Sequence, residues 1–239
     1  MKWVQKLSAA AAMFLLIIVM LLTSFQIGIY GDPEYQFYEE RYEKYQVTEE
    51  LHMELSDVME VTDYMMDYLI GREDELTFVT DVDGREQDFF NEQDRLHMAD
   101  VKNLFLGGLK LRNLFLVLVV LICGGLVFTK CDMRRTLGRA YAIAFGVFAG
   151  LGIFLAIAFS IDFTSCFRIF HEIFFTNDLW MFDPAEDYMI RMLPEGFFSD
   201  MVLRIAGIFA AGLLLVALVF ALWGRLAGKN GRRQEQTER

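Results

Sequence analysis

The 239-residue sequence predicts an all-α integral membrane protein, with four transmembrane helices and a mostly helical extracellular cap that includes one small β element. Hydrophobic residues make up 55% of the chain, which is more than a soluble domain usually carries. Four apolar runs are long enough to cross a bilayer, and acidic and basic residues are separated along the chain. Together these features indicate that the bilayer is the solvent of the apolar runs.

The predicted spans lie in four separate segments. Segment 1–30 holds a short tail and the first apolar run, and the other runs occupy 109–129, 140–161 and 201–223. A helix rises 1.5 Å per residue, so about 20 residues cross a hydrocarbon core of about 30 Å. The runs contain no Asp or Glu, and Arg204 lies near one end, where its long side chain can reach the interface.

The first apolar run also resembles a secretory signal peptide, because Lys2 and Lys6 precede an Ala-rich stretch. A cleavable signal needs a site of small residues after the apolar run. After Leu22 the chain reads Thr-Ser-Phe-Gln-Ile, which is not such a site. We therefore expect the first helix to be retained.

Basic residues predict the orientation. Lys and Arg concentrate in the first residues, in the loop 130–139 and in the tail 224–239, and such residues stay on the cytoplasmic side. Both termini are then cytoplasmic, and segments 31–108 and 162–200 are extracellular. Residues 31–110 contain 22 Asp or Glu but only 7 Lys or Arg, so the cap is acidic.

Three elements are expected in the cap. Apolar residues recur every three or four positions from Glu39 to Ile70, which predicts a helix that ends near Gly71. Residues 76–82 are short, β-branched and alternate between apolar and polar side chains, and Asp83-Gly84 follows them, which favours a strand or turn. A further helix over 91–106 should lead into the second span.

The three histidines all lie in the extracellular segments. His97 precedes Asp100 by three residues, so on a helix the carboxylate could orient the imidazole. The alternative is an ordinary surface histidine. His52 has acidic neighbours and no aromatic enclosure, and we assign it a solvated or packing role.

His171 stands in an aromatic segment. Phe167, Phe174 and Phe175 fall on its side of a helix, where they would shield the imidazole and lower its pKa. A neutral imidazole could act as a general base. The alternative is an interfacial aromatic belt with His171 at its polar end.

The sequence gives little support to other classes of catalytic or binding site. The sequence has no Gly-x-Ser-x-Gly elbow, no His-Glu-x-x-His and no phosphate-binding glycine loop. Its three cysteines predict no disulfide framework. The net charge of −11 argues against a nucleic-acid partner.

Two motifs in this topology resemble one known family, the lipoprotein intramolecular transacylases. The first is His-Met-Ala-Asp-Val-Lys at 97–102, just before the second span, and the second is Phe-His-Glu-Ile-Phe-Phe-Thr-Asn-Asp-Leu-Trp at 170–180, continuing to Pro184. The resemblance covers essentially the whole chain, since family members have four spans and a cap between the first two. Members often carry Glu where this chain has Asp94, so the role of that carboxylate is less defined here.

The resemblance implies an enzyme of the bacterial plasma membrane that acts on a diacylated lipoprotein. The sn-2 acyl chain would move from its glyceryl oxygen to the α-amine of the same N-terminal cysteine, which leaves a lyso-form lipoprotein. No cofactor and no metal is implied. The oligomeric state stays open.

Family resemblance also implies the residue roles. His97 and His171 would be the catalytic acid and base, in an order that the sequence leaves open. Asp100 and Asp94 would support them, and the substrate would contact Phe167, Phe170, Phe174, Asn177 and Trp180. Two other functions stay open: a metal-dependent hydrolase with His97, His171 and Asp100 as ligands, and a non-enzymatic sensor or scaffold whose acidic cap binds a cationic partner.

Overall fold

The structure is a computed structural model that describes residues 2–237, with side chains placed for 2–223 and 225. The chain forms two compact units. The span unit contains the residues up to Gln26, Leu111–Ile157 and those from Ile205 onward, and the cap unit contains Ile27–Lys110 and Ala158–Arg204.

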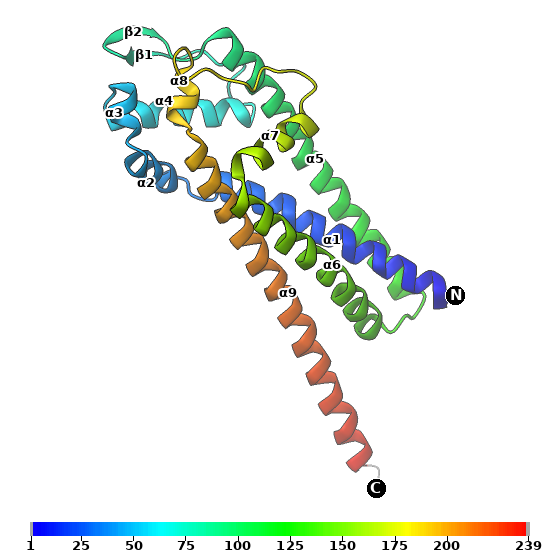
Figure 1. Ribbon diagram of the computed structural model, residues 1–239. Coiled ribbons are helices and arrows are strands. Elements are labelled where there is room, and N and C mark those ends of the chain that lie inside the picture. The colour runs from blue at the N-terminus through cyan, green and yellow to red at the C-terminus, as the bar shows by residue number, and fades with distance from the viewer. Residues whose placement is uncertain (1, 238–239) are drawn as a thin grey trace. The chain divides into compact units, whose positions relative to one another are not determined.

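Four long helices dominate the chain (Figure 1): α1 (Lys2–Tyr30), α5 (Glu92–Phe128), α6 (Met133–Ile161) and α9 (Glu195–Thr237). Each is long and apolar enough to cross a membrane, α9 over Glu195–Trp223. Large apolar side chains such as Val120, Phe154 and Leu215 are exposed on these helices, as expected for surfaces that contact lipid. The four predicted spans are confirmed.

Four alanines form part of the core of the span unit. Ala9 and Ala12 of α1 and Ala140 and Ala144 of α6 are almost completely buried in one cluster. Small side chains let membrane helices approach closely, which strengthens their van der Waals packing. The hydroxyl of Tyr141 donates a buried hydrogen bond of 2.6 Å to a backbone carbonyl of α9.

The prediction of one continuous helix over residues 39–70 is wrong. The chain instead forms α2 (Gln36–Lys44), α3 (Val47–Leu51) and α4 (Leu55–Leu69). Gln46 and His52 adopt left-handed backbone conformations, with φ of 54° and 51°, and these turn the chain between the helices. The apolar spacing continues across both breaks, so it contained no signal for them.

These three helices pack through aromatic side chains. Tyr42 is fully buried, its hydroxyl lies 2.7 Å from that of Thr62, and its ring stacks on Phe197 at 6.0 Å. Gly196 lies directly against Tyr45, where a Cβ atom would come within 2.4 Å of the ring, so a larger residue would displace it. Gly71 has a φ of 80° and ends α4 as predicted.

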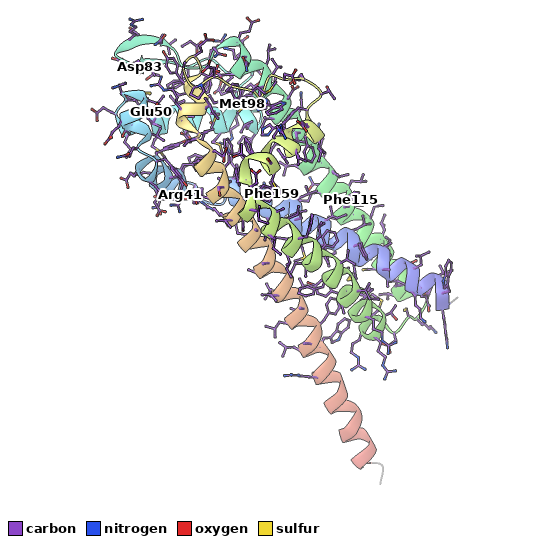
Figure 2. All side chains as sticks on the ribbon, viewed as in Figure 1. Arg41, Glu50, Asp83, Met98, Phe115 and Phe159 are labelled. Carbon is purple, nitrogen blue, oxygen red and sulfur yellow. The ribbon has the colours of Figure 1, made fainter. Side chains whose placement is uncertain are left out.

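The predicted short strand is one arm of a hairpin. β1 (Val79–Val82) pairs antiparallel with β2 (Arg85–Asp88), and Asp83 and Gly84 form the turn with positive φ. β2 reads Arg-Glu-Gln-Asp, which has no strand signal. Asp83, labelled in Figure 2, accepts hydrogen bonds from both terminal nitrogens of Arg191 in α8 (Tyr188–Met192), which ties the hairpin to that helix.

The aromatic segment begins with α7 (Phe163–Phe174). Asp162 caps this helix, because its carboxylate accepts the backbone N–H of Ser165 at 2.9 Å and the Ser165 hydroxyl at 2.6 Å. An irregular stretch follows α7 and runs to α8. α7 carries His171 in its last turn, and α5 carries His97 near its start.

Candidate active site

A reciprocal cap begins α5 and sets the position of His97. The backbone N–H of Asn91 donates to the Asp94 carboxylate at 3.0 Å, and the backbone N–H of Asp94 donates to the Asn91 side chain at 2.9 Å. His97 follows one turn later, beside Met98, which is labelled in Figure 2. This first part of α5 belongs to the cap unit and precedes the part of the helix in the span unit, which begins at Leu111.

Asp94 is completely buried, and burial raises the pKa of its carboxyl to about 7, with a further contribution from the negative charge of Asp187. The Asn91 amide donates a short hydrogen bond to Asp187, which also accepts the backbone N–H of Asp183 at 2.7 Å. Asn91 therefore joins the start of α5 to the segment 183–187. Asp94 acts as a cap, and no hydrogen bond to His97 is present among the described residues.

His97 lies in an aromatic enclosure with only 5% of its surface exposed. Its ring centroid is 5.1 Å from that of Phe175 and 5.3 Å from that of Phe182, and both contacts are edge to face. Burial, with repulsion from His171, lowers the pKa of His97 to about 4. The imidazole is therefore neutral at pH 7.

His171 lies opposite, with its ring centroid 6.0 Å from that of His97. Nδ1 is 2.7 Å from the Phe167 carbonyl oxygen. A carbonyl only accepts, so Nδ1 carries the proton and Nε2 has the lone pair of the neutral ring. Burial lowers the pKa of His171 below its usual 6.5, as the sequence predicted.

Aromatic rings surround His171. The closest is Phe167 at a centroid distance of 4.3 Å, Trp180 stacks on the imidazole at 5.0 Å, and Phe170 and Phe175 lie at 5.4 and 5.6 Å. Phe175 contacts both histidines. These rings restrict where a bound molecule could reach Nε2.

Asn177 organises the loop after α7. Its side-chain amide donates to Asp100 at 2.9 Å, its side-chain oxygen accepts the backbone N–H of Leu179, and its own carbonyl accepts the Trp180 indole N–H at 2.9 Å. Asp100 therefore bonds to Asn177 rather than orienting His97 through a hydrogen bond. Its charge still acts on His97, where it opposes the fall in pKa.

The family model of lipoprotein intramolecular transacylase Lit matches residues 10–198. The chain belongs to this family. It is therefore a multi-pass membrane enzyme of the transacylase type, as its motifs indicated. No curated protein matches the chain.

Solved structures of a transacylase share the fold. The membrane-integral lipoprotein intramolecular transacylase from Bacillus cereus is 21% identical with a TM-score of 0.77, over 97% of this chain and 100% of that one. Two structures of that protein with one histidine replaced, by alanine or by arginine, are 20% identical with TM-scores of 0.71. They cover 97% and 98% of this chain, and 97% and 96% of their own chains.

In this transacylase the structure brings together most of the residues predicted for the site. The ring of His171 contacts the rings of His97, Phe167, Phe170 and Trp180. Asn177 donates a hydrogen bond to Asp100. Phe174 differs, because it lies against Phe170 at 4.8 Å and its side chain is half exposed.

Sequence reasoning missed two contributors to the transacylase site. Phe182, which faces His97, lies in the motif that continues to Pro184, but only the fold shows which ring it covers. Asn91 could have been recognised from the Asn-x-x-Asp spacing at the start of a helix. The hydrogen bond from Asn91 to Asp187 could not have been recognised, because Asp187 is distant in the chain.

The ligand set of the alternative metal hydrolase is not assembled. Within the described part of the chain, no three His, Cys, Asp or Glu side chains are grouped so that they could hold a metal ion. Asp100 is engaged by Asn177 instead. His52 lies outside the site, with 73% of its side chain exposed and Nδ1 2.9 Å from Asp83.

Proposed function

We propose that this transacylase moves the sn-2 acyl chain of a diacylglyceryl lipoprotein to the α-amine of the same N-terminal cysteine, with His171 as proton carrier and His97 as hydrogen-bond donor. One observation carries the proposal: two buried, neutral imidazoles face each other at 6.0 Å, and the backbone fixes the tautomer of one of them. Acyl transfer to an amine needs a proton acceptor and a group that stabilises an oxyanion.

The nitrogen reacts only as a free amine, so the α-ammonium group first loses one proton to water. The amine then attacks the sn-2 ester carbonyl, an N–C bond forms, and the carbonyl oxygen becomes an oxyanion. Nε2 of His171 accepts the second proton from nitrogen, because Nδ1 is committed to Phe167. Burial keeps His171 neutral and ready for this step.

Collapse of the tetrahedral intermediate completes the transfer. The C–O bond to glycerol breaks, and the His171 imidazolium returns its proton to the leaving oxygen. His97, neutral in its aromatic enclosure, donates an N–H to the oxyanion and needs no change of charge. The products are the amide, the glyceryl hydroxyl and one released proton.

Ring closure explains the aromatic enclosure. The attack closes a ring of about eight atoms, through nitrogen, cysteine, sulfur and glycerol, so the substrate must be held in a compact conformation. Phe167, Phe170 and Trp180 contact the His171 imidazole with rigid side chains that can hold the substrate in this conformation. Phe174, on the exposed side of α7, would contact the acyl chains.

We further propose that the cap unit faces the cell exterior and both termini face the cytoplasm. The basic loop 130–139 and the acidic cap support this orientation. Alkaline phosphatase fused at residue 75 should then be active, and fused after residue 135 inactive. An inactive fusion at residue 75 and an active fusion after residue 135 would overturn the orientation. Such a result would leave the proposed reaction unaffected.

A labelled substrate tests the reaction. A synthetic diacylated lipopeptide with a deuterated sn-2 chain is mixed with unlabelled phospholipid and the purified enzyme, and the N-terminal fragment is analysed by tandem mass spectrometry. We expect the deuterated chain on nitrogen and a free sn-2 hydroxyl. A label that stays on glycerol, or an unlabelled chain on nitrogen, would exclude the proposed transfer.

A further inference from the structure

α7 presents sides of different chemical character. Phe167 and His171 point into the site, Ile169 and Ile173 are exposed apolar residues, and the charged pair Arg168 and Glu172 lies on another exposed side. A helix turns by about 100° per residue, so the charged side lies next to the inward side, whereas the two exposed isoleucines lie nearly opposite it. His171 therefore has a charged surface that suits water directly beside it.

A cleft of about 440 Å³ opens on the charged side of α7. Its lining includes the charged residues Arg168, Glu172 and Asp178 and the aromatic residues Phe175 and Trp180. The same two rings also contact His171, at centroid distances of 5.6 and 5.0 Å. The cleft and the imidazole pocket are thus neighbours that share one aromatic wall.

The substrate of the proposed reaction has two chemically different ends. Two acyl chains leave the modified cysteine on the lipid side, and a polar peptide leaves it through its carbonyl. Ionised side chains do not belong in hydrocarbon, so the charged cleft cannot take the acyl chains. A cleft of this size beside the reacting nitrogen can take a short stretch of extended peptide.

We propose that this cleft binds the peptide segment directly after the lipidated cysteine. The inference rests on the proposed function and adds a specificity to it. Two carboxylates, Glu172 and Asp178, outnumber the one guanidinium of Arg168, which lies 3.8 Å from Glu172. The cleft therefore carries net negative charge and disfavours acidic residues at the second and third positions of the lipoprotein.

Charge reversal tests the assignment. Three diacylated lipopeptides with Ser-Ser, Glu-Glu or Lys-Lys after the cysteine are compared as purified substrates in detergent. For the unmodified enzyme we expect the KM of the Glu-Glu peptide to exceed that of the Lys-Lys peptide about tenfold. Asp178→Lys should remove or reverse this preference, and Glu172→Lys should act in the same direction through a second position.

A matched control separates the cleft from the general charge of the cap. Glu86 is an exposed acid in β2 that does not line the cleft, so Glu86→Lys makes the same change in net charge and should leave the preference unchanged. Equal KM values for the three peptides with the unmodified enzyme, or an equal shift with Glu86→Lys, would overturn the peptide subsite. Absence of N-acylated product from all three peptides would instead refute the proposed function, and the subsite with it.

Discussion

The side-chain amide of Asn177 donates a hydrogen bond of 2.9 Å to the carboxylate of Asp100, and this bond joins the loop after α7 to α5. The same asparagine accepts the indole N–H of Trp180 on its carbonyl. Trp180 in turn stacks on His171. One polar residue thus connects the two helices that carry the histidines and places the ring that covers the proposed base.

Asp100 and Asn177 should act through geometry rather than charge. Asp100→Asn keeps an oxygen that can accept the Asn177 amide, so we expect kcat within about threefold of the unmodified enzyme. Asp100→Ala and Asn177→Ala leave a partner unpaired and loosen Trp180, and kcat should fall at least about tenfold. Kinetics of purified variants check this. If Asp100→Asn were as impaired as Asp100→Ala, the negative charge would be the functional feature.

The pH profile should report His171. Burial holds the pKa of its imidazole below 6.5, so the base is free at neutral pH and becomes protonated only as the pH falls through that lower value. Above this pKa, log(kcat/KM) should rise with pH at a slope of about one, while the substrate amine deprotonates. Below it the slope should approach two, since amine and imidazole are both protonated. A slope of two that begins above pH 6.5 would contradict the assignment.

Asp94 should make stability depend on pH. Its pKa is about 7 in the folded protein and near 3.8 when exposed, so the folded state keeps a proton that the unfolded state loses. The free energy of unfolding should therefore fall as pH rises from about 4 to about 7, by roughly 4 kcal/mol if the shift is fully expressed.

Asp94→Asn keeps the oxygen that accepts the Asn91 N–H but cannot ionise. Thermal unfolding in detergent should give similar Tm values for the two proteins near pH 4 and a higher Tm for Asp94→Asn at pH 8. The exposed Asp74→Asn serves as control and should show no such divergence. A constant Tm difference between pH 4 and pH 8 would show that Asp94 is ionised in the folded protein throughout.

Sequence alone could predict the spans, because length and hydropathy are sufficient in a bilayer, where backbone groups must bond within a helix. It could not predict the breaks in the cap. The apolar spacing continues across Gln46 and His52, and each has a side chain that gives no indication of a left-handed turn. β2 was missed because its four residues are polar and gain order only from pairing with β1.

The candidate site also has one part that the sequence could predict and another that it could not. Local spacing placed Phe167 against His171, because i and i+4 meet on any helix. The approach of His171 to His97 is a tertiary contact, and only the family motifs suggested it. The link from Asn177 to Asp100 replaces the local pairing of His97 with Asp100, since a partner from another segment competed for the carboxylate.

The two-histidine site is tested most directly by acyl position in a reporter lipoprotein. The reporter is produced in a diacylating host with the unmodified enzyme, His97→Ala, His171→Ala, His52→Ala or no enzyme, and its N-terminal peptide is analysed by mass spectrometry with expression checked by immunoblot. We expect N-acylated lyso-lipoprotein from the unmodified enzyme and His52→Ala, and the unchanged diacyl form from His97→Ala and His171→Ala. Full conversion by either of those two variants would contradict the account.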